Sequence, residues 1–222
     1  MSTLAVVVAG GPEEVDVLTA VGGEPMVVRS VRSLLATGLL DHVVLLAADE
    51  RRDALVQACF GLSVSVPMHA LSDMQPHGPQ RADATAGDGP ITISSADVVV
   101  VHEASRPFAP TALATAVVAA IHEGHEMAVP VLPLVDTVKQ VDAEGLVLGT
   151  PDRSGLRVLQ TPLAVRGDLL RPALAADPLA LARHHAATGG TVHTVPGHSD
   201  AFAVHSAWDL ELAELLAKRI ER

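Results

Sequence analysis

Residues 96–134 read ADVVVVHEASRPFAPTALATAVVAAIHEGHEMAVPVLPL, and this stretch decides the fold of the chain. It begins and ends with continuous apolar, β-branched runs, which are typical of strands buried on both faces of a parallel sheet. The stretch between these runs, residues 110–124, is long and apolar enough for a helix. Two buried strands joined by a helix form a right-handed crossover, so the segment predicts two strands of one parallel sheet.

The same alternation of strand and helix precedes this segment. Three runs predict further buried strands, LAVVVA at 4–9, HVVLLAA at 42–48 and SVSVPMH at 63–69. Residues 25–37 predict a helix, because apolar side chains recur at three- and four-residue spacing and a glycine follows. A second helix is expected over residues 49–61, from an aspartate that can cap it to a glycine that can end it. The predicted fold class is therefore α/β, with a Rossmann-like, mostly parallel twisted sheet and flanking helices.

The sequence pattern changes after residue 134, where the last of these predicted strands ends. Two short β-rich runs flank Asp-Ala-Glu-Gly, which predicts a projecting β-hairpin arm within residues 136–162. Residues 166–190 have a mostly helical pattern, and the runs TVHTV (191–195) and AFAVHS (201–206) have the composition of strands. A final helix is expected to open with the capping-box spacing Ser206-x-x-Asp.

Composition narrows the functional classes. The chain has 222 residues, 49% of them apolar, which is enough for one core, so residues 1–222 are expected to form a single domain. A formal net charge of −11 and the scarcity of aromatic residues argue against a nucleic-acid partner. No apolar run approaches the ~18 residues of a membrane span. The single cysteine, Cys59, allows no intramolecular disulfide, which favours a cytoplasmic location.

The first candidate site follows from the sheet. Ligands of open parallel sheets bind beyond the carboxyl ends of the strands. In VVHEASRPF, residues 100–108, Glu103 and Arg106 come directly after a buried strand. A carboxylate there suits a metal ion or a phosphate-bound water, and a guanidinium suits a phosphate. The alternative is that the two side chains form an ion pair on the surface.

Three stretches carry a resemblance to a known family. VVHEASRPF resembles the motif VHDAARP, residues 128–162 resemble the stretch that runs from a DT-K motif through an arm, and AWDLELAELL resembles a closing helix. On these residues the chain is similar to the 2-C-methyl-D-erythritol 4-phosphate cytidylyltransferases of isoprenoid synthesis. The resemblance implies a nucleotidyltransferase that joins cytidine triphosphate (CTP) and methylerythritol phosphate, releases pyrophosphate and uses Mg²⁺. It also implies a homodimer formed through the arm.

The resemblance assigns residues to the acceptor side of that reaction. Arg106 and Thr137 match positions that line the sugar-phosphate site. Arg153 matches the arm arginine that reaches the neighbouring subunit's site, and Thr161 matches a further position beside the acceptor phosphate. The alternative for Thr161 is a turn residue before the proline that follows it. Glu103 stands where the family has an aspartate on the metal side.

The nucleotide side is a weaker match. Gly10 and Gly11 fall in the loop that cradles the phosphates in the family. Gly78, Arg81 and Asp83, in HGPQRADAT, match positions that frame the cytosine and ribose. The alternative is a loop that matches by chance.

Cations that the family has on this side are missing. Register counted back from the helix that begins at Pro25 puts Asp16 at the position of one lysine, and Ala203 stands at the position of the other. No lysine or arginine precedes Arg29. Unit charges ~4 Å apart interact by ~4 kcal/mol at the effective dielectric of a protein surface, so an acid in place of a cation opposes a triphosphate.

Two functions remain open at this point. The first is an active cytidylyltransferase, or a relative with a changed nucleotide. The second is a non-catalytic paralogue, which binds the sugar phosphate or pairs with a competent cytidylyltransferase as a heterodimer. The length of the resemblance favours the first, and the loss of residues on the nucleotide side, with the acceptor side retained, favours the second.

Overall fold

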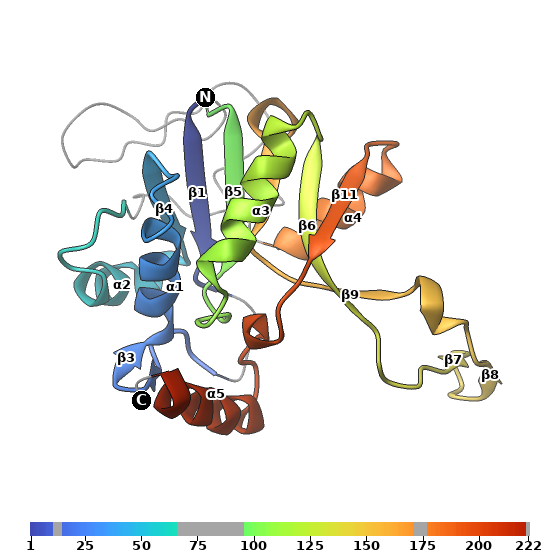
Figure 1. Ribbon diagram of the computed structural model, residues 1–222. Coiled ribbons are helices and arrows are strands. Elements are labelled where there is room, and N and C mark those ends of the chain that lie inside the picture. The colour runs from blue at the N-terminus through green and yellow to red at the C-terminus, as the bar shows by residue number, and fades with distance from the viewer. Residues whose placement is uncertain (11–14, 66–95, 171–176, 221–222) are drawn as a thin grey trace.

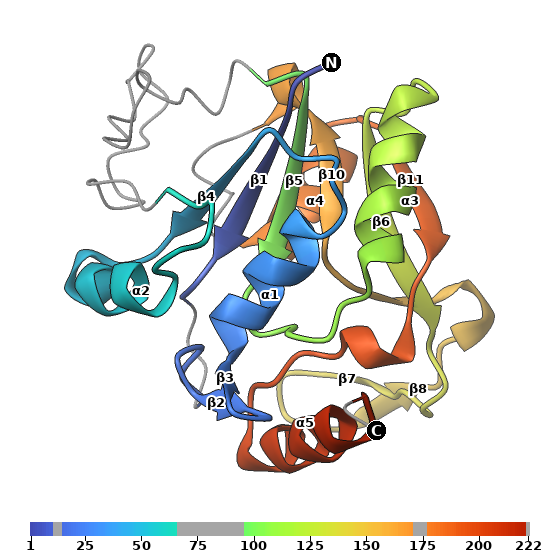
Figure 2. The ribbon, with the colours of Figure 1, turned by 60° about the vertical axis from the view of Figure 1, so that its left-hand side comes forward.

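Figure 1 shows the computed structural model, which describes residues 1–10, 15–65, 96–170 and 177–220. A central sheet has helices on both faces, and a thin arm projects from the body. The N-terminus lies at one end of the strands and the C-terminus near the other, as Figures 1 and 2 both show. The predicted α/β class is confirmed.

The central sheet has seven strands within the described residues. Six of them, in hydrogen-bonding order, are β11 (Val192–Pro196), β6 (Met127–Pro133), β10 (Leu163–Arg166), β5 (Val98–Glu103), β1 (Thr3–Val8) and β4 (His42–Leu46). The seventh, β9 (Arg157–Leu159), pairs with β6. β1 is parallel to β4 and β5, and β11 is parallel to β6.

β10 is the departure from a parallel sheet, and the sequence pattern did not predict it. It lies between β5 and β6 and is antiparallel to both. The pattern of a run as short as LAVR does not indicate whether the strand is parallel or antiparallel. Here the chain enters the sheet on its way back from the arm. As a result, the residues just before β10 lie beside the carboxyl end of β5.

The helices form two layers around the sheet. α1 (Met26–Leu35) and α3 (Thr111–His122) lie on one face, and α4 (Pro178–Ala187) lies on the other (Figures 1 and 2). α2 (Arg52–Ala58) follows a 3₁₀ turn, η1 (Asp49–Arg51), beside β4, and α5 (Ala207–Ile220) lies near the carboxyl ends of the strands. Within the described ranges, no helix is both long and apolar enough to cross a membrane.

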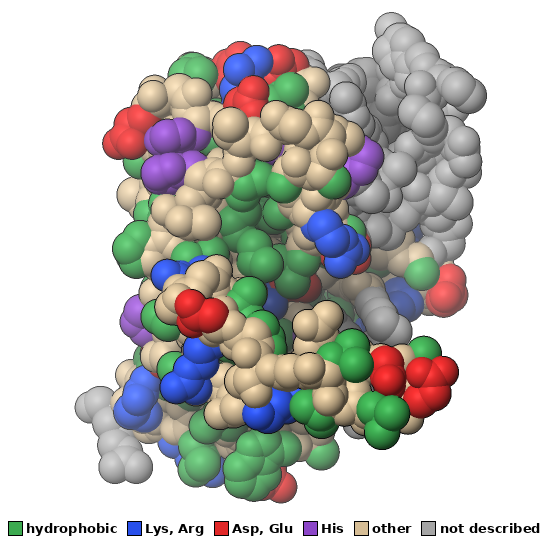
Figure 3. Space-filling view, turned by 90° about the vertical axis from the view of Figure 1, so that its right-hand side faces the viewer, with side chains coloured by type: hydrophobic (Ala, Val, Ile, Leu, Met, Phe, Trp, Pro, Cys, Tyr) green, Lys and Arg blue, Asp and Glu red, His purple; other side chains and the backbone are tan. Residues whose placement is uncertain are grey.

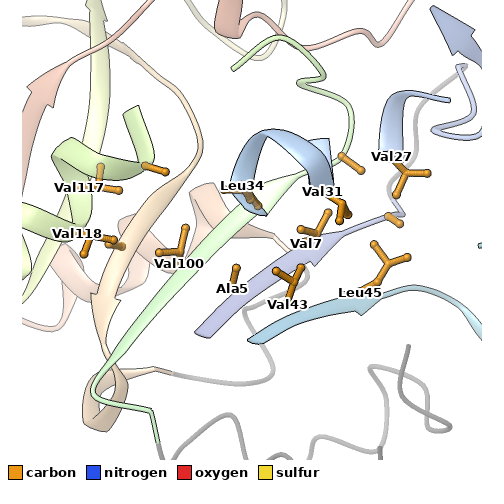
Figure 4. Packing of buried hydrophobic residues seen from close by; sticks show 14 of the residues in the cluster. Ala5, Val7, Val27, Val31, Leu34, Val43, Leu45, Val100, Val117 and Val118 are labelled. Carbon is orange, nitrogen blue, oxygen red and sulfur yellow. The ribbon is translucent and has the colours of Figure 1, made fainter. Parts of the chain in front are cut away.

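The alternation of side chains along each strand fixes these layers. Ala5 and Val7 of β1 pack with α1 and α3 in one buried cluster, part of which Figure 4 shows. Val6 and Val8, which point the other way, pack in a second cluster with Leu181 of α4. Fully burying a valine or leucine contributes about 1.5–3 kcal/mol. The two clusters therefore hold helices on both faces of the sheet.

A third cluster of buried apolar side chains holds α5 beside the carboxyl ends of the strands. Its members are Val15, Val21, Met26, Phe108, Val204, Ala213, Leu216 and Ala217. The expected capping box at the start of α5 is confirmed, because Ser206 N–H donates to Asp209 Oδ2 at 2.9 Å and Asp209 N–H donates to Ser206 Oγ at 3.3 Å. The helix that follows the candidate site is thus fixed at its first turn.

The arm is the hairpin that the sequence predicted. β7 (Gln140–Val141) and β8 (Val147–Gly149) are antiparallel, and the turn between them is closed by Asp142 Oδ1, which accepts the N–H groups of Glu144 and Leu146. Gly145 has a φ of +86°, which favours glycine at this turn.

Some boundaries differ from the sequence predictions. Of the run 63–69, Ser65 forms a parallel bridge with Val44, and residues 66–69 lie outside the described ranges. The run 201–206 is not a strand, because it begins at the end of a 3₁₀ turn, Ser199–Ala201, and continues as irregular backbone. A small hairpin of β2 (Ala20–Val21) and β3 (Glu24–Pro25) precedes α1 and was not predicted.

Candidate active site

The site lies where β1 and β5 end side by side. Val8 pairs with Glu103 in parallel register, and Ala104 N–H donates to the carbonyl oxygen of Val8 at 2.9 Å. Gly10 therefore leaves the sheet beside the residues that follow β5. The chain before β10 approaches from the other side, since Glu103 N–H donates to Thr161 Oγ1 at 3.1 Å. Three segments that are distant in sequence meet at this edge.

Glu103 and Arg106 form a largely buried ion pair. Arg106 Nε donates to Glu103 Oε2 at 2.5 Å, and the Arg106 and Glu103 side chains are 8% and 18% exposed. Arg106 Nη1 also donates to the carbonyl oxygen of Ala201 at 2.9 Å. The alternative of a surface ion pair is therefore correct about the pairing of the two side chains but wrong about their position, because both are largely buried. A buried pair persists only when hydrogen bonds satisfy its remaining groups, and Ala201 supplies one of them.

Thr161 is fully buried and bonds to the same pair. Its hydroxyl donates to Glu103 Oε2 at 3.4 Å and lies 3.2 Å from His102 Nδ1. The peptide bond from Thr161 to Pro162 is cis. The alternative of a simple turn residue does not account for these contacts. The role of Thr161 toward an acceptor phosphate stays a prediction.

His102 was not predicted as part of the site. Burial, together with the weaker effect of the positive charge of Arg106, lowers its pKa from 6.5 to about 3. The imidazole is therefore neutral at physiological pH, and it lies against the hydroxyl of Thr161 without adding charge. Its signal in the sequence is a histidine that directly follows four valines in a run otherwise apolar enough for a buried strand.

Gln160 was also missed, and it ties β9 and β10 to the chain near residue 200. Its side-chain Nε2 donates to the carbonyl oxygens of His198 at 2.9 Å and Ala201 at 3.2 Å, and its Oε1 accepts the N–H of His198 at 2.9 Å. A Cβ on Gly197 would lie 2.4 Å from Gln160 Oε1, so this glycine is needed for the close approach. The signal available in the sequence was a glutamine in the largely apolar run LQTPLAV, residues 159–165.

The two arm residues expected at the acceptor site lie elsewhere in this chain. Arg153 Nη1 donates to the carbonyl oxygen of Val135 at 2.5 Å, at the base of the arm, and Thr137 is exposed. The structure does not bring either residue into the cluster of Glu103, Arg106 and Thr161. A side chain that serves the site of a neighbouring subunit is expected to be exposed in one chain alone, so both roles stay predictions.

The nucleotide side is described only in part. Gly10 lies at the end of β1, whereas Gly11, Gly78, Arg81 and Asp83 lie outside the described residues. Asp16 forms an ion pair with Arg51, and its Oδ1 accepts the N–H of Leu18 at 2.8 Å.

Ala203, where the resemblance expects a lysine, lies close to the ion pair of the site. Its neighbour Val204 donates its N–H to the carbonyl oxygen of Ser105 at 2.8 Å. Ala201, two residues earlier, accepts from Arg106. The backbone of this segment is therefore positioned at the site, while the side chain at residue 203 carries no charge.

A metal ion at the carboxyl end of β5 has the carboxylate of Glu103 available. No group of three or more His, Cys, Asp or Glu side chains that could hold a metal occurs among the described residues. Mg²⁺ in phosphate-transfer sites is bound by one or two carboxylates together with substrate phosphates and water. The lone carboxylate of Glu103 therefore fits an ion that is held mainly by its substrate.

The sheet, the glycine after its first strand and the acid–arginine pair after the adjacent strand define a nucleotidyltransferase of the α/β class. The family model of 2-C-methyl-D-erythritol 4-phosphate cytidylyltransferase (IspD) matches residues 9–219. The chain belongs to this family.

Relatives and solved structures agree with this assignment. The 2-C-methyl-D-erythritol 4-phosphate cytidylyltransferase of Frankia casuarinae is 39% identical over 207 residues, which cover 92% of this chain and 74% of the relative. That of Nocardia farcinica is 37% identical over 211 residues, covering 94% of this chain and 88% of the relative. The crystal structure of the Thermus thermophilus cytidylyltransferase is 26% identical, with a TM-score of 0.68 and coverage of 98% and 100%. The synthase structure from Anaerococcus prevotii, 18% identical with a TM-score of 0.74 over 98% of this chain and 99% of that one, supports the fold.

Proposed function

We propose that this protein is a cytidylyltransferase that joins CTP and 2-C-methyl-D-erythritol 4-phosphate. The observation that carries the proposal is the match of the family model across residues 9–219, together with the ion pair of Glu103 and Arg106 at the carboxyl end of β5. The family resemblance assigns Arg106 to the acceptor side of the site and Glu103 to the metal side.

The chemistry is a displacement at the α-phosphorus of CTP. An oxygen of the acceptor phosphate forms a bond to this phosphorus, the bond to the bridging oxygen of the β-phosphate breaks, and pyrophosphate leaves. Such a reaction depends on positioning and on neutralising phosphate charge rather than on a covalent intermediate with the protein. Arg106 is the cation at the end of β5, and Thr161 places a hydroxyl beside it.

Glu103 is the residue that would hold Mg²⁺, with the substrate phosphates as the other ligands. When bound, the ion neutralises negative charge on the phosphates. Glu103 contributes a carboxylate whose position is fixed by Arg106 Nε and Thr161 Oγ1. These two contacts keep its side chain at the carboxyl end of β5 before any ligand arrives.

We further propose that two copies of the chain associate through the arm. Hydrophobic side chains are visible at the surface on the side from which the arm projects (Figure 3). The exposed apolar residues of the hairpin are Val141, Leu146, Val147 and Leu148. Apolar side chains that gather on a projecting hairpin are expected to be covered by a partner. Sedimentation should give a dimer for the wild type and a monomer for Leu148→Asp, and a monomeric wild type at micromolar concentration would reject this assembly.

A second candidate function is a non-catalytic paralogue that binds the sugar phosphate or pairs with a competent cytidylyltransferase. The observation in its favour is the charge on the nucleotide side, with Asp16 and Ala203 where the resemblance expects lysines. Such a protein should bind methylerythritol phosphate in calorimetry and show no heat with CTP.

A coupled pyrophosphate-release assay separates the two candidates. With CTP, methylerythritol phosphate and MgCl₂, the enzyme should release pyrophosphate faster than a heat-killed control, and only when both substrates are present. Absence of turnover with CTP and with the other common nucleoside triphosphates would leave the non-catalytic paralogue as the function.

A further inference from the structure

Arg51 belongs to a different element from the first loop, yet it lies at the same edge of the sheet. β1 and β4 are parallel neighbours with Val8 opposite Leu46, and Ala9 N–H donates to the carbonyl oxygen of Leu46 at 2.8 Å. The chain after β4 therefore leaves the sheet next to the chain after β1. Arg51 ends the 3₁₀ turn η1 on that part of the chain.

The side chain of Arg51 reaches Asp16. Arg51 Nη2 forms an ion pair with Asp16 Oδ1, and the two side chains are 27% and 53% exposed. Asp16 is also fixed by the N–H of Leu18, which donates to the same oxygen at 2.8 Å. The residue that stands in place of a lysine thus holds a cation from another segment of the chain.

The other described arginines close to this loop are engaged in the fold. Arg29 Nε donates to the carbonyl oxygen of Val21 at 2.9 Å, and its guanidinium lies 5.1 Å from the centre of the Phe108 ring. Arg32 Nη1 pairs with Glu24 at 2.5 Å. These contacts hold α1 to the small hairpin that precedes it. Arg51 differs because, among the described residues, its ionic partner is a residue of the loop itself.

A guanidinium can serve a phosphate while it is paired with a carboxylate. It has five N–H donors in a planar fork, and the contact with Asp16 uses one Nη of that fork. The remaining donors have the geometry that binds phosphate oxygens. Because Arg51 is only partly buried, a ligand at the carboxyl ends of β1 and β4 has access to it.

We propose that Arg51 binds the phosphate chain of the nucleoside triphosphate and supplies the charge that the first loop lacks. When no ligand is bound, its guanidinium pairs with Asp16. The inference rests on the proposed function, because that function places a triphosphate at this edge of the sheet. Arg51 is a binding residue and takes no part in bond making or breaking.

The proposal gives the two members of the ion pair opposite roles. If the pair only tethered the loop to η1, removing either partner would break the same tether and weaken CTP binding equally. With Arg51 as a phosphate ligand, Arg51→Ala weakens binding, whereas Asp16→Ala removes a negative charge and releases the guanidinium, so it tightens binding. Arg32→Ala is the matched control, since it removes an arginine of another surface ion pair.

Calorimetric titration of the full chain with CTP and MgCl₂ tests this. We expect Arg51→Ala to weaken CTP binding by roughly 10-fold or more, the loss of one charge-assisted contact, and Arg51→Lys to lose less. The weakening should be smaller for cytidine monophosphate, which lacks the outer phosphates. Arg32→Ala should stay within about twofold of the wild type, as expected for an exposed pair. Urea unfolding midpoints equal to that of the wild type would show that each variant is folded.

Equal losses in Arg51→Ala and Asp16→Ala would overturn the proposal, and so would a loss in Arg51→Ala no larger than that in Arg32→Ala. Because binding is measured apart from turnover, the two proposals can fail separately. Unchanged CTP binding by Arg51→Ala with turnover by the wild type rejects the role of Arg51 and keeps the enzyme. Weakened binding by Arg51→Ala with no turnover by the wild type keeps the role of Arg51 and rejects the enzyme. A wild type that does not bind CTP rejects both.

Discussion

The acceptor side and the nucleotide side of this site are held in different ways. On the acceptor side Arg106, Gln160 and Thr161 are buried, and their side chains bond to one another's segments. On the nucleotide side Asp16 and Arg51 are partly exposed and form an ion pair near the surface. The first group is part of the structure that joins β5, β10 and the chain near residue 200. The second group lies near the surface and is not part of this buried structure.

This difference explains where the sequence departs from its family. A side chain that belongs to a buried network cannot be exchanged without loss of folding free energy, because its partners remain buried and unpaired. An exposed cation contributes little to stability and can be lost or supplied from another segment. The resemblance predicts the same division, with most matched residues on the acceptor side and with Asp16 and Ala203 in place of lysines on the nucleotide side.

The largest effect is expected from Arg106→Ala. This change leaves Glu103 without its partner in a site where the carboxylate is mostly buried, so urea unfolding should show a loss of about 3 kcal/mol in the free energy of unfolding. Arg166→Ala, which breaks the exposed pair with Asp168, is the control and should cost less than ~1 kcal/mol. Similar losses for the two variants would mean that the acceptor side is not held by its buried pair.

His102→Asn should make the free energy of unfolding less dependent on pH between pH 7.5 and pH 5. The pKa of His102 is about 3 in the fold and 6.5 in the unfolded chain, so the unfolded state binds the proton first and stability falls as the pH drops from 6.5 toward 3. Between pH 7.5 and pH 5 this group accounts for a loss of about 2 kcal/mol, which His102→Asn should remove.

The carboxylates with lowered pKa values affect stability at lower pH than this window. Hydrogen bonds lower the pKa of Glu126 and Asp152, so their contribution to stability is lost only at more acidic pH. Urea unfolding at pH 7.5 and pH 5 measures the difference, and His184→Asn, at an exposed histidine, should keep the wild-type dependence. The same pH dependence in His102→Asn as in the wild type would show that His102 is not buried in its neutral form.

Gly197→Ala tests the close contact that Gln160 makes. The new Cβ would lie 2.4 Å from Gln160 Oε1 and 2.9 Å from the carbonyl oxygen of Val131, so one of them must move. Thermal unfolding should report a loss of about 1–2 kcal/mol, as for other overpacked sites. Gly149→Ala, where a Cβ meets no heavy atom within 4 Å, should leave the stability nearly unchanged. An unchanged stability of Gly197→Ala would indicate that Gln160 does not fix this segment.

The smallest effect on stability is expected on the nucleotide side. Asp16→Ala removes a partly exposed ion pair, so the free energy of unfolding should change by less than ~1 kcal/mol in urea titration. Together, Asp16→Ala and Arg106→Ala compare the partly exposed ion pair of the nucleotide side with the largely buried ion pair of the acceptor side. A loss as large as that of Arg106→Ala would show that both sides are structural.

Much of the fold follows from local sequence patterns. The valine-rich runs of β1 and β5, the spacing of apolar residues in α1 and the turn residues of the arm each have a local physical cause, and the structure confirms them. The antiparallel β10 was missed because three apolar residues indicate burial but not the direction of the strand. The run 201–206 was misjudged because its N–H groups bond outside any strand, that of Val204 to Ser105 and those of His205 and Ser206 to Asp209.

The site was predictable in its residue types and less so in its contacts. Glu103 and Arg106 were identified because polar residues directly after a buried strand stand out. Their ion pair depends on how the side chains turn toward each other, which the spacing leaves open. The contact between Arg51 and Asp16 joins residues on two different elements, and it exists only because β1 and β4 are neighbours in the sheet.

The central claim is that this chain forms the diphosphocytidyl product, with an intact acceptor side and a triphosphate site rebuilt around Arg51. Mass spectrometry of a reaction with the purified full chain, CTP, methylerythritol phosphate and MgCl₂ tests it most directly. The account predicts the mass of the diphosphocytidyl sugar alcohol together with pyrophosphate, and neither when methylerythritol phosphate is omitted. Absence of this product with any common nucleoside triphosphate, from a protein that still binds methylerythritol phosphate in calorimetry, would contradict the account.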